Sequence, residues 1–508
     1  MTTIGDILHH GRRVAAHHPV PRVVVDAAGW EAAAFLAADG RAVLLSLWAE
    51  RDQVHMALLA GDPAEIAVVS LACPEGAFPS VGQHHPPAIR LERAIHDLYG
   101  LEPRNAEDAR PWLDHGRWQV RKPLGEAAAD RGAGDAYAFL PVEGEGLHQI
   151  PVGPVHAGII EPGLFRFTAN GETVARLEQR LGYVHKGVDG LMQGADLGRA
   201  ARLAGRVSGD STVAYSIAFA QAIEAASGVE APRRAQWLRA LMLELERIAN
   251  HLGDIGAICN DASFAIMLAH CGILRERVLR AAAAAFGHRL MMDRVVPGGV
   301  AADLAAEGVA ALRAALSEIT ARFPALVALY DNTTSLQDRT VGTGSLSPTL
   351  ARQFGAGGYV GRASGRAFDA RGLASPLPYA TLGFQPALRS EGDVNARVWV
   401  RIDEVTQSLA LIGRLLDGLP AGEIAVALPA TDAPVAGPRE GMALVEGFRG
   451  DVLAWVRLGA DGRVARCHLR DPSWFQWPLL EAAIEGNIVA DFPLCNKSFN
   501  CSYSGHDL

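Results

Sequence analysis

Residues 234–254 read RAQWLRALMLELERIANHLGD, and this stretch decides the fold. Its large apolar side chains recur every three or four positions, with charged residues between them: Trp237, Leu238, Leu241, Met242, Leu245, Ile248 and Leu252. This spacing matches the turn of an α-helix that buries one face. We therefore predict a long core helix here.

The same spacing recurs on both sides of this stretch. It is found in residues 212–227, 264–286, 303–322 and 402–418. Several amphipathic helices in sequence are typical of a helical bundle. From about residue 145 onward, the spacing of apolar residues therefore predicts long helices.

The two ends of the chain favour strands instead. Short β-prone runs occupy residues 22–25, 42–48, 54–59 and 65–71, before an amphipathic helical pattern at 90–99. Near the other end, residues 443–448, 452–458 and 464–469 are separated by glycine-containing turns, which predicts a small meander.

A segment rich in Gly, Ala and Asp, around residues 125–135, indicates a boundary between these regions. We predict an α+β protein with a small N-terminal α/β-sandwich-like domain at 1–125 and a linker at 126–145. Residues 146–508 then form a large, mainly α-helical bundle domain that ends in the β meander.

Composition excludes several classes of protein. The 508 residues are 49% hydrophobic and 20% charged, which is typical of a globular chain of two or three domains. The net charge of -9 argues against nucleic acid as a partner. The start lacks the pattern of a signal peptide, and no apolar run reaches the roughly 18 residues of a membrane span. The six cysteines are too few and too scattered for a disulfide framework, which favours the cytoplasm, and they form no CxxC pair, which weighs against thiolate-bound nickel, zinc or iron–sulfur clusters.

Several motifs carry a resemblance to a known family. Residues 153–163 (GPVHAGIIEPG) and 177–187 (LEQRLGYVHKG) resemble the opening of group 4 NiFe hydrogenase large subunits and of the complex I subunit that shapes the quinone cavity. Residues 243–252, 297–300 and 471–473 follow in the family's order, so the resemblance covers about residues 146–508.

The N-terminal part resembles a different complex I subunit. Residues 90–101 and 112–116 are similar to the smaller subunit that packs beside the large one. Both subunits would be fused in this chain, as they are in the large subunits of formate hydrogenlyase and hydrogenase-4. The fold expected from the resemblance is that of the hydrogenase large subunit and the complex I 49-kDa subunit.

The nickel ligands of the hydrogenases are missing. The family holds nickel with four cysteine thiolates from two CxxC motifs, because soft sulfur ligands suit this metal. The resemblance places Ser208, Ser211, Ser502 and Gly505 at these degenerate positions. We therefore expect no nickel–iron centre and no hydrogenase activity. Cys495 and Cys501 are interpreted as buried free thiols rather than as a rebuilt site.

In complex I the corresponding pocket holds a quinone headgroup, which a tyrosine and a histidine bind. The resemblance assigns these roles to Tyr215 and His156, and makes a quinone the leading acceptor. A phenol and an imidazole can both donate a hydrogen bond to a carbonyl and relay a proton. The alternatives are a packed core tyrosine and a histidine whose hydrogen bond orders a loop.

Other charged residues are candidates for proton transfer. Glu161 could belong to a proton path, and burial of Asp210 would raise its pKa and suit it to the same task, although either could be a cap or an ion-pair member. Five further residues are interpreted as paired buried charges: Asp369, Arg371, Asp393, Arg401 and Glu404. The glycines of residues 355–361 do not form a nucleotide-binding GxGxxG motif, so we expect no direct binding of NAD.

The resemblance implies a subunit of a membrane-bound respiratory or energy-converting oxidoreductase complex of the NADH-quinone oxidoreductase or hydrogenase-4 kind. Its expected partners are an iron–sulfur small subunit, which would hold the cluster, and membrane subunits of the antiporter-like and quinone-site kinds. The chain would be cytoplasmic, peripheral to the inner membrane, with membrane contact only through partners. Two alternatives remain: a structural or coupling subunit without its own substrate, and an active NiFe hydrogenase.

Overall fold

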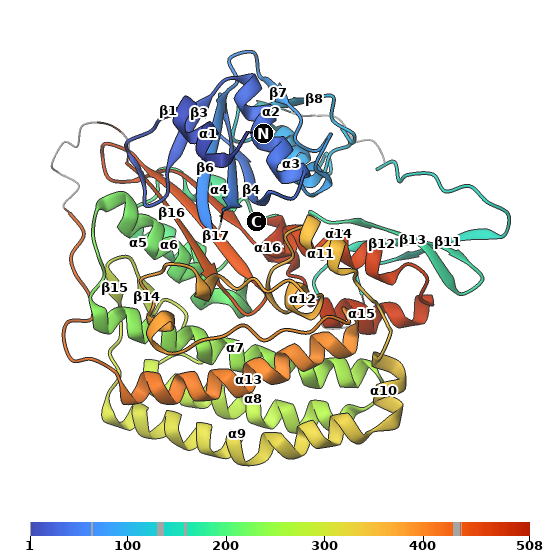
Figure 1. Cartoon of the computed structure of the whole chain (residues 1–508), viewed down its shortest axis with the longest axis vertical. Coiled ribbons are helices and arrows are strands. Elements are labelled where there is room, and N and C mark those ends of the chain that lie inside the picture. Colours follow the sequence, from blue (N-terminus) through green and yellow to red (C-terminus); the bar gives the residue numbers. More distant parts are fainter. Residues whose placement is uncertain (1, 62–63, 130–136, 157–159, 430–436, 438) are drawn as a thin grey trace.

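The computed structural model describes residues 2–61, 64–129, 137–156, 160–429, 437 and 439–508. An N-terminal sheet with its helices lies at one end, a layer of long helices lies at the other, and a C-terminal sheet lies between them (Figure 1). The mixed α+β class predicted from the sequence is confirmed.

The N-terminal region is built on a five-stranded sheet of order β1-β3-β6-β5-β4. Strands β4, β5 and β6 run antiparallel, and β3 is parallel to β6. The predicted strands and the predicted helix are all present. The elements are α1 (Ile4–His10), β1 (Arg12–Arg13), β2 (His17–His18), β3 (Arg22–Val25), α2 (Ala27–Ala38), β4 (Ala42–Ala49), β5 (Gln53–Ala60), β6 (Glu65–Ala72), β7 (Ala77–Pro79), η1 (Pro86–Ala88), α3 (Ile89–Tyr99) and β8 (Glu102–Arg104).

The strands of this sheet are nearly continuous apolar runs, because both faces of the sheet are covered. Leu44 and Leu58 join a core with the N-terminal helices, whereas Leu45 and Trp48 pack against Trp455 of the C-terminal sheet. A strand buried on both faces loses the alternation of polar and apolar residues.

The region after residue 145 departs from the prediction of long helices. An antiparallel meander, β11-β12-β13, comes first, and no helix of the described residues begins between it and Val188. Its strands project to one side of the molecule (Figure 1). The strands of this region are β9 (Val120–Arg121), β10 (Ala128–Ala129), β11 (Leu147–Val152), β12 (Leu164–Asn170) and β13 (Thr173–Arg180).

The central bundle confirms the predicted helices. Helix α7 packs against α8 and α13, and α9 packs on α8 (Figure 1). Among the described residues, no helix combines the length and apolar content needed to cross a membrane. The elements are α4 (Val188–Met192), α5 (Leu197–Ala204), η2 (Gly209–Ser211), α6 (Thr212–Ser227), α7 (Arg233–Asp261), α8 (Ala265–Phe286), β14 (Val295–Val296), β15 (Gly299–Val300), α9 (Ala306–Asn332), α10 (Thr334–Thr340), α11 (Pro348–Gln353), α12 (Gly358–Ala363), η3 (Ala370–Gly372), η4 (Pro378–Thr381) and α13 (Val394–Asp417).

Helix α13 begins eight residues before the predicted start at 402, at Val394. Its first turns bury Arg397 and Arg401, which interrupt the apolar periodicity. The true start is marked by Asp393, whose side chain accepts a hydrogen bond from the Ala396 amide at 2.7 Å. An N-cap of this type satisfies an amide that has no partner within the helix.

The predicted C-terminal meander is confirmed and is extended by one strand. Strand β2, from the N-terminal region, pairs with β16 in parallel and completes a sheet of order β18-β17-β16-β2. This pairing joins the two ends of the chain. The elements are β16 (Arg439–Glu446), β17 (Asp451–Leu458), β18 (Val464–Arg470), α14 (Ser473–Ile484), η5 (Val489–Asp491), α15 (Phe492–Phe499) and α16 (Tyr503–Asp507).

Candidate functional site

The four positions assigned to former nickel ligands lie together. Ser208 and Ser502 share a hydrogen bond between their hydroxyl oxygens at 2.9 Å. The Ser502 hydroxyl also accepts from the Gly505 amide at 2.9 Å, which caps α16. Ser211 joins the group through Asp210, to which its hydroxyl donates at 3.3 Å. The three serines are each 3% exposed, and their hydroxyls are hydrogen-bonded to one another or to Asp210.

Asp471 fills the space that a side chain at position 505 would need. A Cβ atom built on Gly505 would lie 2.7 Å from the Asp471 Cγ and 2.8 Å from the Ser502 hydroxyl oxygen. Real Cβ atoms essentially never come within 3.0 Å of a neighbour. A cysteine at this position would therefore require Asp471 to move.

Tyr215 donates its hydroxyl hydrogen to Asp471. The two oxygens are 2.6 Å apart, and Tyr215 is completely buried on α6. Burial raises the pKa of Tyr215 well above its ordinary value, and the negative charge of Asp471 adds to this effect. Tyr215 is therefore a neutral donor at any physiological pH. Asp471 was not among the sequence candidates, although the motif at 471–473 was a signal for it.

Asp210 forms a two-pronged ion pair with Arg449. One Arg449 nitrogen lies 2.7 Å from Asp210 Oδ1, and the other contacts Oδ2. Burial by itself would raise the pKa of Asp210, but the charge of Arg449 and hydrogen bonds from Ser208 and Ser211 lower it overall. The expectation of a raised pKa is therefore wrong. Nothing in the sequence pointed to Arg449, because it lies in the turn between β16 and β17.

His156 lies in a loop, away from the buried hydroxyls. Its Nε2 donates to the Gly163 carbonyl at 2.8 Å, and the ring is only half-buried. This is the bond expected of a histidine that orders its loop. Residues 157–159 of the same motif lie outside the described residues.

Glu161 is exposed and lies beside the last helix. Its carboxylate accepts a hydrogen bond from the Ser504 amide, in the first turn of α16, at 3.2 Å. Neither Glu161 nor His156 is hydrogen-bonded to Tyr215 within the residues that the structure describes. The sequence candidates thus divide into side chains near Ser208 and two others, the half-buried His156 and the exposed Glu161.

The two C-terminal cysteines are buried thiols. Burial raises the pKa of Cys495 to about 11 and raises the pKa of Cys501 further. Both therefore keep their protons, whereas a metal ligand must be a thiolate. Within the described ranges, no three His, Cys, Asp or Glu side chains gather into a group that could hold a metal ion.

The buried charges of the bundle are paired, as interpreted from the sequence. Arg362 contacts Glu404 at 2.6 Å and Asp369 at 3.0 Å. Arg371 contacts Asp369 at 2.7 Å, and Arg401 contacts Asp254 at 3.0 Å. Asp393 differs, because it serves as a helix cap. These groups hold α7, α12 and α13 in position behind the site.

The glycines of residues 355–361 permit close backbone packing. A Cβ on Gly358 would collide with the Arg449 carbonyl, and a Cβ on Gly361 would collide with the Ala356 carbonyl. Their conformation brings α12 against the turn that carries Arg449. This packing accounts for the glycines without a nucleotide.

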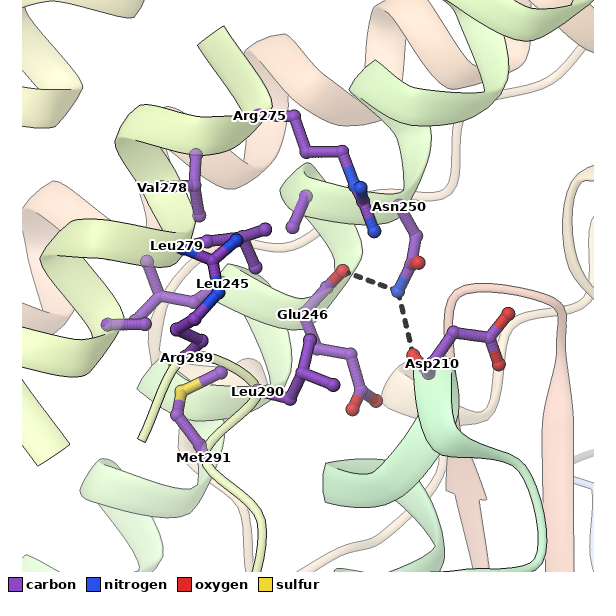
Figure 2. A pocket seen from close by; sticks show the side chains of 12 residues that line it. Asp210, Leu245, Glu246, Asn250, Arg275, Val278, Leu279, Arg289, Leu290 and Met291 are labelled. Atoms are coloured by element: carbon purple, nitrogen blue, oxygen red, sulfur yellow. Dashed lines mark hydrogen bonds between the residues drawn. The ribbon is translucent and has the colours of Figure 1, made fainter. Parts of the chain in front are cut away.

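A cleft between α7 and α8 reaches the edge of the buried group (Figure 2). Glu246 and Asn250 of α7, Arg275 of α8 and Asp210 of η2 lie on its walls. The Asn250 amide donates to the backbone carbonyls of Asp210 and Glu246, at 2.8 and 2.9 Å, and thereby ties the two elements together. We name this feature the α7–α8 cleft.

Comparison with known proteins identifies the two parts of the chain. Residues 23–129 match the family described as respiratory-chain NADH dehydrogenase, 30 Kd subunit. Residues 261–507 match the 49 Kd subunit of the same enzyme.

Whole-chain relatives carry both parts. Formate hydrogenlyase subunit 5 of Escherichia coli (strain K12) is 31% identical over 441 residues, which cover 85% of this chain and 77% of the relative. The fused C/D subunit of NADH-quinone oxidoreductase from Phocaeicola vulgatus is 28% identical over 407 residues, which cover 76% of this chain and 78% of the relative. A solved structure of the membrane-bound sulfane sulfur reductase, an archaeal respiratory membrane complex, aligns with a TM-score of 0.67 at 26% identity. The alignment covers 73% of this chain and all of that one.

The fold defines a large subunit of the type shared by hydrogenases and complex I, and three serines and a glycine stand at the positions that the resemblance assigns to nickel ligands. The chain belongs to the family in which the 30 Kd and 49 Kd subunits of complex I are joined, together with formate hydrogenlyase subunit 5 and the fused C/D subunit of NADH-quinone oxidoreductase. Its relatives are subunits of membrane-bound hydrogenase-like and NADH-quinone oxidoreductase complexes.

Proposed function

We propose that this chain is the nickel-free large subunit of a membrane-associated oxidoreductase complex, in which an acceptor of the quinone class is reduced beside Tyr215 and Asp471. Electrons would come from an iron–sulfur cluster in a partner subunit. The observation that carries the proposal is the packing of Asp471 over Gly505. The Asp471 carboxylate occupies the space that a ligand side chain at position 505 would need, and it accepts the hydrogen bond of Tyr215.

Nickel does not fit the residues present. The donor set is three neutral hydroxyls and a glycine without a side chain, and soft thiolates are what the metal needs. The Ser208 and Ser502 oxygens already share a hydrogen bond at 2.9 Å. No step of the proposed function therefore involves nickel.

Tyr215 and Asp471 fit a carbonyl acceptor. A quinone, when bound, supplies reversible two-electron chemistry that consumes protons. Tyr215 keeps its hydroxyl proton and donates it to Asp471, which positions the phenol. Rotation of the O–H bond would let Tyr215 donate the same hydrogen to another acceptor. The high pKa of Tyr215 makes it a hydrogen-bond donor rather than a source of negative charge.

The site needs a partner to complete it. The loop that carries His156 also presents Val155, which is 85% exposed, the largest value among the exposed large apolar side chains of the described residues. Large exposed apolar patches mark contact surfaces, and we take Val155 as one point of such a surface. We place the iron–sulfur partner and the membrane subunits, antiporter-like ones included, on this side, with the chain on the cytoplasmic face of the inner membrane.

A structural or coupling role without a substrate is the second candidate. It is favoured by the closed packing at Ser208 and Ser502 and by the complete burial of Tyr215. In that case the hydrogen-bonded group would only stabilise the subunit within its complex.

Turnover of the purified complex distinguishes the two candidates. Quinone-dependent turnover is expected to fall on the order of a hundredfold in Tyr215→Phe, because a positioned proton donor contributes at least that much. Tyr330→Phe is the matched control, since Tyr330 is also buried and donates to Asn395 at 2.7 Å. Undiminished turnover in Tyr215→Phe would reject the assigned role and leave the coupling candidate. Stoichiometric nickel in the isolated complex would reject both.

A further inference from the structure

A groove with a volume of about 830 Å³ lies where the N-terminal region meets the C-terminal sheet. Its walls come from the segment after β2, the C-terminal end of α6, the loop after η3 and strand β16. We name it the β16 groove. Sites of roughly 300–1,000 Å³ can hold an organic ligand, so this groove has room for one. Seven apolar side chains stand on its walls: Val20, Ile66, Val229, Leu373, Pro376, Met442 and Leu444.

One wall of the groove is a strand edge that is only partly paired. Strand β2 pairs with β16 at Glu440 and Gly441 alone. The Glu440 N–H donates to the Ala16 carbonyl at 2.9 Å, so Glu440 and every second residue after it turn their backbone groups away from β17. Leu444 is one of these residues, is partly exposed, and has no described residue bonded to its N–H or C=O at this edge. An open edge of this kind is a template for another strand.

A buried amide without a partner faces the same groove. Gln221 of α6 lines the groove and is 8% exposed, and among the described residues its Nε2 has no hydrogen-bond acceptor. Gln236, on the same wall, donates instead to the Ala231 carbonyl at 3.0 Å. Leaving a buried donor unpaired is costly, so Gln221 favours an occupant that brings an acceptor.

The charges on the walls select the sign of the occupant. No Lys or Arg side chain lines the groove within the described ranges, and its two acidic residues are Glu224 and Glu230. Glu224 is already paired with the buried Arg239, whereas Glu230 is exposed and forms no ion pair with a described residue. The C-terminal end of α6 adds partial negative charge beside Glu230. The groove therefore suits a segment that carries a positive charge.

We propose that the β16 groove binds an extended segment of a partner subunit, which adds a strand to the edge of β16 beside β2. The segment pairs its backbone with Leu444, offers a carbonyl to Gln221 and places a Lys or Arg beside Glu230. A peptide fits better than a small molecule, because its backbone repeats the donors and acceptors of a strand edge. Apolar side chains of the segment lie against the apolar wall.

This inference goes beyond the acceptor site. Tyr215 lies in the first turn of α6, and the groove lies at the other end of that helix, which packs along β16 (Figure 1). The inference requires that the chain works within a complex, as its relatives do, and is independent of the acceptor. The tests below need no turnover, so they can fail separately from the quinone proposal.

Hydrogen exchange resolved to single residues tests the added strand in the intact complex. The Leu444 amide should exchange on the order of a hundredfold more slowly in the complex than in the isolated full chain, because the segment supplies an acceptor. The Val445 amide is the internal reference, since Val445 faces β17 and pairs with Val452 in both states. Rapid exchange of Leu444 in the complex overturns the proposal, whether or not the isolated chain is stable.

Cross-linking identifies what occupies the groove. His18 is an exposed residue on its wall, and all six native cysteines are buried, so His18→Cys accepts a photoreactive maleimide selectively. In the purified complex this label should cross-link to one segment of another subunit. Attachment only to this chain, or to a small molecule, overturns the proposal.

Variants in the labelled background test the contacts. Leu444→Pro removes the N–H that the segment needs, and proline is tolerated at a strand edge, so the cross-link yield should fall about tenfold. Glu230→Lys should also lower the yield, whereas Glu172→Lys, in the exposed turn between β12 and β13, should not. If Leu444→Pro prevents folding, Glu230→Lys and its control decide the outcome. A yield that neither groove variant changes rejects the added strand.

Discussion

The Asp471 carboxylate lies where a side chain of residue 505 would stand, with its Cγ 2.7 Å from the position of a Cβ on Gly505. The same carboxylate accepts the Tyr215 hydroxyl at 2.6 Å. One residue thus excludes a side chain at position 505 and positions the phenol. The position that the resemblance assigns to a nickel ligand therefore lies within a hydrogen-bonded network.

Gly505→Ala is expected to destabilise the protein by about 1–3 kcal/mol, because the added methyl group overpacks a buried site. Gly209→Ala is the control from the same site, since a Cβ there meets nothing within 4 Å. Urea unfolding of both variants measures the difference. Equal effects would show that Asp471 moves aside without penalty.

Ser208→Ala and Ser502→Ala are expected to be non-additive. Each single change leaves the other hydroxyl with one hydrogen-bond partner fewer, which costs about 1–3 kcal/mol of stability. The double variant should therefore lose less free energy of unfolding than the sum of the two single variants. Ser364 is buried but bonds to the Val360 carbonyl instead, so Ser208→Ala with Ser364→Ala should be additive. Additivity in the first pair would contradict the shared hydrogen bond.

Arg449→Ala is expected to reduce the free energy of unfolding by about 1–3 kcal/mol, since it removes a buried guanidinium and leaves the half-exposed Asp210 carboxylate with only its serine hydrogen bonds. The Arg449 and Asp210 side chains are 6% and 37% exposed, whereas in the surface pair of Arg206 and Asp293 both side chains are exposed, at 43% and 39%. Arg206→Ala should therefore change the stability by less than about 1 kcal/mol. The pKa of Asp210 should also rise in Arg449→Ala, which titration of the variant would detect.

The stability of the protein is expected to depend on Glu246 between its ordinary pKa of 4.5 and the folded value of about 8. In this window the unfolded carboxyl has lost its proton and the folded one retains it. The free energy of unfolding therefore falls as the pH rises, by up to about 1.4 kcal/mol per pH unit. Glu246→Gln should flatten this dependence in unfolding curves measured across the window. Parallel curves for the variant and the wild type would show that the folded pKa is not raised.

Local periodicity was sufficient to predict the helices that present one apolar face. It failed where burial is not apolar, as at the start of α13, where Arg397 and Arg401 are fully buried in ion pairs and hydrogen bonds. It also missed the meander β11-β12-β13, although only Gly171 and Glu172 separate β12 from β13 and the pair Asn170-Gly171 is a strong hairpin signal.

The candidate site was predicted in part. The order of the motifs placed Ser208, Ser211, Ser502 and Gly505 at equivalent positions, and the structure brings them together. Their neighbours Asp471 and Arg449 come from a strand end and from a turn. A contact between such elements is visible only once the chain is folded.

By itself, the amino-acid sequence determined the α+β class, the helical bundle, the C-terminal meander and the absence of sulfur at the positions that the resemblance assigns to nickel ligands. These properties depend on the identity and the spacing of residues along the chain. Only the tertiary structure decided that Asp471 fills the space of a side chain at position 505, that Arg449 lowers the pKa of Asp210, and that β2 joins the C-terminal sheet. The reason is physical: distance and burial set the energy of a charge or a hydrogen bond, and both arise from packing between segments far apart in the chain.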